Sequence, residues 1–126
     1  MLVGVDDIPT RWNLQAERPR LLVIGATTHW SVMASFHREG LPCAGCAHPS
    51  DDANNAPIPT VAFVSFLAGL FAATYFVQDL TDDLVPIEQM KYVTALRPET
   101  LWVSPLAFRN ECPATDHSAE VSMGLR

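Results

Sequence analysis

Two cysteines three residues apart and a third far along the chain are the side chains with the clearest capacity for chemistry. Cys43 and Cys46 form a C-x-x-C pair, and Cys112 follows much later. The spacing of the pair lets two thiolates converge on one tetrahedral metal ion such as zinc. A thioredoxin-like redox pair has the same spacing, but it opens a helix, whereas here Pro49 and a polar segment follow. The cysteines therefore indicate either a structural zinc site or three buried apolar side chains.

A four-coordinate zinc site needs one ligand more than the three thiols supply. A second C-x-x-C pair starting at Cys112 would need a cysteine at the position of Thr115. His117 is the best substitute, because imidazole nitrogen binds zinc well and a C-x-x-x-x-H spacing can close a site. Asp116 and His48 are the poorer alternatives. We therefore predict one structural zinc ion held by Cys43, Cys46, Cys112 and His117.

Length and composition limit what else the chain can be. Its 126 residues suffice for a single domain, and 48% hydrophobic with 17% charged residues is too apolar for a disordered chain. The formal net charge of -6 argues against attraction to nucleic acid or anionic lipid. Three cysteines exclude a complete disulfide framework, and residues 1–7 lack the basic start and apolar run of a signal peptide. We expect a cytoplasmic protein without nucleic-acid or membrane partners.

Short apolar runs predict the strands that must position the cysteines. Residues 2–5 and 21–24 are uninterrupted apolar runs, typical of strands covered on both faces in an α/β sheet. Alternation predicts a third strand over residues 30–37, just before the C-x-x-C pair. Residues 91–96 and 101–108 predict an antiparallel hairpin with a turn at 97–99. The polar segment 47–59 between these groups predicts a long loop.

The segment 61–77 contains no charged residue and predicts a long helix. It is slightly short for a membrane span and has no basic residue at its flanks, so a span is the alternative rather than our prediction. A helix that is apolar all round must be covered somewhere. We therefore predict a helix buried between the sheet and a partner surface, and with it either a homodimer or a complementing chain.

Several segments, taken in order, resemble the ThiF/MoeB/HesA adenylyltransferases, which are relatives of ubiquitin-activating enzymes. Residues 5–15 resemble the family's T-D-N-x-x-x-R-x-x-L-N segment, and residues 21–25 resemble its P-L-V-x-G strand. Residues 40–46 resemble its G-x-P-C-x-x-C zinc pair, and residues 56–77 resemble the apolar helix after its crossover loop. Cys112 falls where the family's second zinc pair begins. The resemblance covers residues 3–117.

The resemblance implies an ATP-dependent enzyme that adenylates the C-terminal carboxylate of a ubiquitin-like or sulfur-carrier protein. It places Asp6 at the carboxyl end of a strand, beside the ATP phosphates and magnesium. Arg11 would meet a phosphate or the tail of the carrier protein. The alternatives are that Asp6 caps the following helix and that Arg11 is a solvated surface residue. No catalytic thioester cysteine is expected, because the zinc site takes all three thiols, and no catalytic residue is assigned.

The family's glycine-rich loop, ribose-binding acidic residue and basic phosphate ligands lie upstream of the position of Met1. No G-x-G-x-x-G pattern follows a strand in residues 1–126. We therefore expect residues 1–117 to be the C-terminal half of a ThiF-type domain, with a polar tail at 118–126. ATP and magnesium would bind only together with the missing N-terminal half.

The predicted fold class is α/β. It is the C-terminal part of a ThiF-type, Rossmann-like, mostly parallel sheet, with a long buried helix, an antiparallel hairpin and a zinc staple. The predicted function is a partial ATP-dependent adenylyltransferase that is inactive as an isolated chain. The alternative is a non-catalytic, zinc-stapled module for protein interaction or dimerisation.

Overall fold

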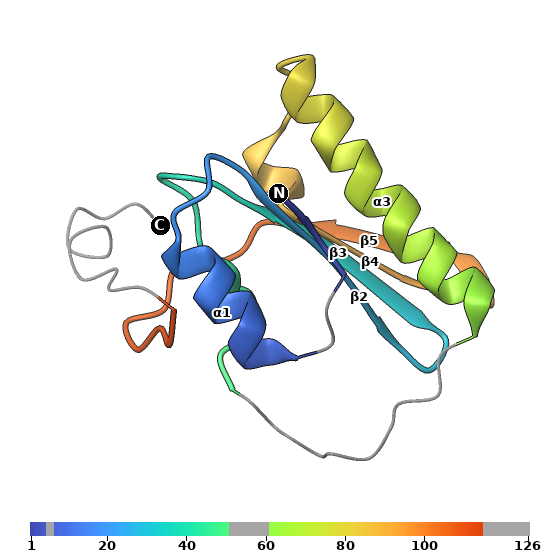
Figure 1. Cartoon of the computed structure of the whole chain (residues 1–126). Coiled ribbons are helices and arrows are strands. Elements are labelled where there is room, and N and C mark those ends of the chain that lie inside the picture. Colours follow the sequence, from blue (N-terminus) through green and yellow to red (C-terminus); the bar gives the residue numbers. More distant parts are fainter. Residues whose placement is uncertain (5–6, 51–60, 115–126) are drawn as a thin grey trace.

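The computed structural model of this chain contains a five-stranded sheet with helices on both faces (Figure 1). The structure describes residues 1–4, 7–50 and 61–114. In chain order the elements are β1 (Leu2–Val3), α1 (Ile8–Ala16), β2 (Leu22–Thr28), β3 (Ser31–His37), α2 (Ala44–Ala47), α3 (Ala62–Leu80), the 3-10 helix η1 (Pro86–Glu88), β4 (Met90–Thr94) and β5 (Arg97–Ser104).

The sheet is mixed, so the prediction of a mostly parallel, Rossmann-like sheet is not confirmed. The strand order is β1-β2-β3-β4-β5, in which β1 and β2 run parallel and each later pair is antiparallel. The connections give the reason. Residues 29–30 link β2 to β3 and residues 95–96 link β4 to β5, and such short links permit only antiparallel pairing. A parallel pair needs a longer crossover, which α1 provides between β1 and β2.

The five predicted strands are present with shifted boundaries, and β2 in particular extends to Thr28 instead of ending at residue 24. Leu22, Val23 and Ile24 of β2 are fully buried, as expected for a strand covered on both faces. The hairpin turn lies at residues 95–96 rather than 97–99, because Thr94 pairs with Arg97. The second hairpin strand also ends at Ser104 rather than at residue 108. A proline within β5 is tolerated because β5 is an edge strand.

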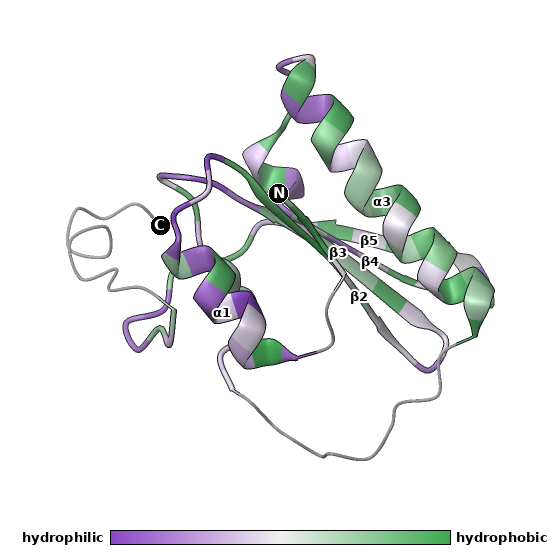
Figure 2. Cartoon of the chain, viewed as in Figure 1, coloured by the Kyte–Doolittle hydropathy of each residue, from purple (hydrophilic) through white to green (hydrophobic). Residues whose placement is uncertain are grey.

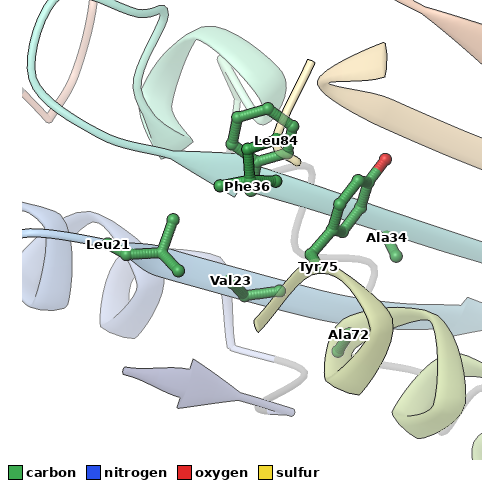
Figure 3. Close-up of a cluster of buried hydrophobic side chains, with 7 residues drawn as sticks. All are labelled: Leu21, Val23, Ala34, Phe36, Ala72, Tyr75 and Leu84. Atoms are coloured by element: carbon green, nitrogen blue, oxygen red, sulfur yellow. The ribbon is translucent and has the colours of Figure 1, made fainter. Parts of the chain in front are cut away.

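Helix α3 forms the main hydrophobic core with one face of β2 and β3 (Figure 3). The rings of Phe36 and Tyr75 meet edge to face with centroids 4.9 Å apart. The Tyr75 hydroxyl donates a hydrogen bond of 2.6 Å to the Glu88 carbonyl oxygen, which ties α3 to η1. Gly25 of β2 lies against α3, where a Cβ would make a tight contact of 3.1 Å with the Ala68 carbonyl oxygen. The glycine therefore allows α3 to approach the sheet closely.

Within the described part of the chain only one side of α3 is buried, against the sheet, and burial of the other side by a partner surface stays a prediction. The side toward the sheet carries Val64, Ala68, Ala72, Tyr75 and Asp79. Phe66 on the outer side is 74% exposed, and apolar residues continue along the whole helix (Figure 2). By length and composition alone α3 would suffice to cross a membrane, although its inner side packs on the sheet. One sheet face can contact only one side of a helix, so the outer side stays exposed.

Helices α1 and α2 cover the opposite face of the sheet. Leu14 of α1 packs against a cluster formed by Val3, Leu22, Ile24 and Ala44. The side chain of Asp7 caps α1 by accepting hydrogen bonds from the hydroxyl and the backbone N–H of Thr10, and these bonds lower the pKa of its carboxyl group. Helix capping, considered above for Asp6, is thus performed by its neighbour.

The burial of β2 on both faces predicts that truncating one of its side chains destabilises the fold. Leu22→Ala should lower the free energy of unfolding by about 2 to 5 kcal/mol, because the side chain is fully buried and its removal leaves a cavity. Leu96→Ala is the matched control, since Leu96 lies in the hairpin turn and is 60% exposed. It should change the stability by about 0.5 kcal/mol or less. Urea unfolding of both variants measures the difference, and equal losses would contradict this assignment of the core.

Candidate functional site

The three cysteine sulfurs converge on one point. The Sγ atom of Cys43 lies 3.2 Å from that of Cys112, and the other two Sγ–Sγ distances, from Cys46 to Cys43 and to Cys112, are 4.0 Å. Tetrahedral zinc with Zn–S bonds of about 2.3 Å requires sulfurs about 3.8 Å apart. The triangle has the size that a zinc ion needs. The structure therefore supports a metal site more than it supports three separate apolar side chains.

Distant parts of the chain supply the thiols. Cys43 is the N-cap residue of α2 and Cys46 lies inside that helix, so the pair does open a helix, of four residues, contrary to the expectation above. Cys112 comes from the segment after β5. Gly45 makes this approach possible, because a Cβ at that position would lie 2.7 Å from the Sγ of Cys112. The Nε atom of Arg109 donates a hydrogen bond of 3.0 Å to the Cys46 carbonyl oxygen, which fixes the segment against α2.

The electrostatics of Cys46 favour the form that binds metal. Its hydrogen bond with the Cys43 thiol lowers the pKa of the Cys46 thiol, and this effect outweighs the opposing effect of burial. The thiolate is the form of cysteine that coordinates a metal ion.

The fourth ligand stays a prediction. His117 and Asp116 lie outside the described residues. His48, the remaining alternative, is not part of the cluster, because its ring faces Arg11. Within the described part of the chain, the group of possible ligands consists of the three cysteines.

A buried polar network, which the sequence analysis missed, holds the start of the C-x-x-C segment. His37 Nδ1 lies 2.9 Å from the Pro42 carbonyl oxygen and therefore carries the proton, which leaves Nε2 to accept from the Ser35 hydroxyl at 2.9 Å. Gln89 Nε2 also donates to the Pro42 oxygen, at 2.7 Å. Burial lowers the pKa of His37 to about 4, so the ring is neutral at pH 7. The sequence pattern that could have indicated this network is the spacing of Ser35 and His37, which places both side chains on the same face of one strand.

Helix α1 is attached to the same segment. Gln15 Oε1 accepts a hydrogen bond of 3.1 Å from the backbone N–H of Ala44, at the start of α2. Trp12 Nε1 donates to the His48 carbonyl oxygen at 2.9 Å, just beyond α2. Three short segments, α1, α2 and the chain around Cys112, therefore meet at one corner of the molecule.

Arg11 is 4% exposed, so its interpretation as a solvated surface residue is wrong. Its Nη1 lies 3.1 Å from His48 Nε2. Burial, with the nearby Arg11 charge as a second cause, lowers the pKa of His48 to about 4. The ring is therefore neutral at pH 7 and can accept this hydrogen bond.

Arg11 and His48 line a pocket of about 260 Å³ beside the last residues of β2. The other residues around it are Ile8, Ala26, Thr27, Thr28, Ser31, Met33 and Tyr92. The pocket lies at the carboxyl end of the parallel pair β1–β2, where open α/β sheets place ligands. Asp6, predicted to bind magnesium at this end, lies outside the described residues.

The thiol triangle leads to a prediction about metal. Protein purified without chelator should contain one zinc ion per chain, measured by elemental analysis. Cys46→Ala should lose most of this zinc and melt at a lower temperature, because metal binding at a small site contributes directly to folding. Negligible zinc in the unmodified protein would contradict the assignment.

Two glycines provide a matched control for the zinc prediction. Gly45→Ala would place a methyl group against Cys112 and should weaken zinc retention against a chelator. Gly4→Ala should not, because a Cβ at Gly4 has no neighbour within 4 Å. Equal retention by the two variants would show that Cys112 is not held over Gly45.

His48 leads to a prediction about pH. Its pKa in the folded state, about 4, lies below the ordinary value of 6.5, so the unfolded chain binds more protons between these values. Stability should therefore fall as the pH is lowered from 6.5 toward 4. His48→Gln removes this contribution, so the stability of the variant should depend less steeply on pH, by up to about 1 kcal/mol per pH unit. Urea unfolding at several pH values tests this, and parallel curves would contradict it.

Comparison with known proteins finds a likeness of fold. No family model and no curated protein sequence matches the chain. Among solved structures, the crystal structure of E. coli MccB with MccA-N7isoASN matches with a TM-score of 0.65 and 11% sequence identity. The match covers 90% of this chain and 39% of the MccB chain. The chain therefore shares the fold of part of MccB, and it spans well under half of that protein's length.

Proposed function

We propose that this chain is the C-terminal part of a ThiF-type adenylyltransferase domain, which activates the C-terminal carboxylate of a ubiquitin-like or sulfur-carrier protein. The main support for this proposal is the cluster of three thiols between α2 and the segment after β5. The sequence resemblance assigns a zinc pair to Cys43 and Cys46 and a further ligand to Cys112, and the structure brings these three sulfurs together. The likeness to MccB supports an adenylyltransferase-like fold.

The role proposed for zinc is structural. When bound, the ion would cross-link α2 to the segment after β5 through thiolate ligands. Because Gln15 and Trp12 attach α1 to the residues around α2, the cross-link would also fix α1. Helix α1 in turn carries Arg11, which lines the pocket at the end of β2. The metal would therefore hold a binding surface in place without touching a substrate.

The Arg11 pocket is the proposed place for an anionic group. A guanidinium that is nearly buried keeps its positive charge, and its neighbour His48 is neutral at pH 7. Thr28, Ser31 and Tyr92 bring hydroxyl groups to the same pocket. A phosphate of ATP or the terminal carboxylate of a carrier protein has the charge that this site favours. Asp6 is proposed to hold magnesium on the strength of the resemblance.

The β1 edge of the sheet offers a place where a complementing N-terminal half could add a strand. β1 is the edge strand on this side, and among residues 1–4 the pairing with β2 ends at Val3, opposite Ile24. A pocket of about 350 Å³ lies between this edge and α3, lined largely by small residues. A further parallel strand with its helix would extend the sheet here, as in doubly wound folds. We propose that the nucleotide-binding half adds at β1.

ATP binding tests the proposal. The 126-residue chain alone should bind ATP about 10⁴-fold more weakly than a complete domain, because about four charge-assisted hydrogen bonds to the phosphates are missing. Fusing the N-terminal half of a family member, or adding it in trans, should restore pyrophosphate exchange into ATP. Asp6→Ala in the complemented protein should abolish exchange.

Glu39→Ala is the control for loss of a carboxylate, since Glu39 is exposed and does not line the pocket. It should leave exchange unchanged. Micromolar ATP binding by the chain alone would contradict the proposal. Failure of complementation, together with binding of a carrier protein in calorimetry, would favour the non-catalytic interaction module instead.

A further inference from the structure

The cluster of three thiols contains one pair of sulfurs that lie closer together than a shared zinc ion would hold them. The Sγ atoms of Cys43 and Cys112 are 3.2 Å apart, whereas the Sγ of Cys46 lies 4.0 Å from each of them. Two thiolates on one tetrahedral zinc ion are about 3.8 Å apart, which fits the two longer distances. A disulfide brings its sulfurs to about 2.05 Å, so the pair of Cys43 and Cys112 has the shortest distance to close.

The three thiols also differ in their access to solvent. Cys43 and Cys46 are both 3% exposed, whereas Cys112, in the segment after β5, is partly exposed. Oxidation of a cysteine depends on exposure of its sulfur, so a dissolved oxidant reaches Cys112 before the other two. The thiol nearest to the oxidised sulfur is then that of Cys43.

Contacts that do not require a metal ion hold Cys112 in this position. A Cβ at Gly45 would lie 2.7 Å from the Sγ of Cys112, so this thiol lies directly over the backbone of α2. The same Cβ would lie 2.8 Å from that of Ala114, which brings the neighbouring chain equally close. Arg109 Nε donates a hydrogen bond of 3.0 Å to the Cys46 carbonyl oxygen. The segment after β5 is therefore fixed on α2 by its own packing.

We propose that Cys43 and Cys112 form a reversible disulfide when the protein meets a hydroperoxide, and that this bond replaces zinc as the cross-link between α2 and the segment after β5. The Cys112 sulfur attacks an oxygen of hydrogen peroxide, which forms an S–O bond, breaks the O–O bond and releases water. The Cys43 sulfur then attacks the sulfur of this sulfenic acid, so the S–S bond forms and the S–O bond breaks. The leaving hydroxide takes the thiol proton of Cys43 and departs as water.

The two steps balance without any further reactant. Two thiols and one hydrogen peroxide give one disulfide and two waters, and two electrons pass from the sulfurs to the peroxide oxygens. Neither ATP nor a carrier protein takes part, so the chemistry stands apart from the function proposed above. Disulfides of proteins in reducing compartments are usually transient and redox-sensing, which fits a bond of this kind.

The disulfide and a zinc ion exclude each other at this site. The S–S bond takes two of the three thiols and leaves Cys46 as the one thiol ligand of the cluster, which is too few for a structural zinc site. Oxidation should therefore release the ion, yet it keeps the same two segments joined. Because 69 positions separate Cys43 from Cys112, the bond closes a long loop and constrains the unfolded chain strongly. The fold should thus survive the loss of zinc.

Mass spectrometry of the full chain treated with hydrogen peroxide tests the proposal. The intact single chain should lose two hydrogen atoms, about 2 Da, and dithiothreitol should restore them. Trypsin should yield peptides 39–91 and 110–126 joined by a reducible bond, because the two cysteines lie in different tryptic peptides. Iodoacetamide should label Cys46, the thiol outside the pair. Metal-free protein should form the same bond, so the result does not depend on the zinc prediction above.

A zinc-loaded sample provides a second readout. Its zinc should pass to a chromophoric chelator in step with the loss of the two hydrogen atoms, and circular dichroism should show that the oxidised chain stays folded. Reduction should restore the capacity to bind one zinc ion per chain.

Two cysteine variants form the matched comparison. Cys46→Ala should still lose two hydrogen atoms at about the rate of the unmodified protein, since both partners of the bond remain. Cys112→Ala should oxidise at least about 10-fold more slowly, because its two remaining thiols are buried. Gly45→Ala, which displaces Cys112, should also slow bond formation, whereas Gly4→Ala should not. Circular dichroism checks that each variant is folded.

Several results would overturn the proposal. A disulfide between Cys43 and Cys46 would leave peptides 39–91 and 110–126 separate. A bond that is lost in Cys46→Ala would show that Cys46, rather than Cys43, is the partner. Oxygen added to Cys112 as sulfinic or sulfonic acid, without an S–S bond, would show that no second thiol reaches it in time. Zinc that stays bound after the S–S bond has formed would refute the exchange of one cross-link for the other.

Discussion

The burial of β2 on both faces is the constraint on which the rest of the structure depends. Leu22 and Ile24 face α1 and α2, while Val23 faces α3, and all three side chains are fully buried. A strand of this kind must be covered by two layers, so the helices cannot lie on the same side. The crossover helix α1 takes one face because it joins the parallel strands β1 and β2. Helix α3 is left to cover the other.

The corner that holds the cysteines follows from that arrangement. Once α1 lies on its face of the sheet, Gln15 can reach the start of α2, and the buried network of His37 and Gln89 fixes Pro42 just before Cys43. Three thiols this close together would repel one another if they were ionised, because thiolates carry the same negative charge. A metal ion would remove that repulsion, and the surrounding hydrogen bonds orient the loop that carries two of the thiols. The same corner fixes Arg11 at the end of β2, so the cysteine cluster and the pocket share one support.

The sheet also determines which surfaces stay exposed. A sheet face can bury only one side of a long helix, and an open sheet keeps an edge strand on each side. Here the exposed features include the outer side of α3 and the β1 edge. They differ in kind, because a sheet edge offers unpaired backbone groups to a further strand, whereas the helix side offers apolar side chains.

The sequence by itself determined the five strands, the long helix, the two-sided burial of β2, the hairpin and the identity of three metal-ligand candidates, because apolar runs and C-x-x-C spacing are local patterns. It did not indicate the short helices α2 and η1. It did not determine strand direction, since mixed and parallel sheets present similar apolar runs. It also could not show that Arg11 is buried, that His48 faces it, or that α3 is covered on one side only. Those properties depend on which surfaces meet across large separations in the chain. Only the tertiary structure brings residues 43 and 112 within hydrogen-bond distance and decides which apolar residues are left outside.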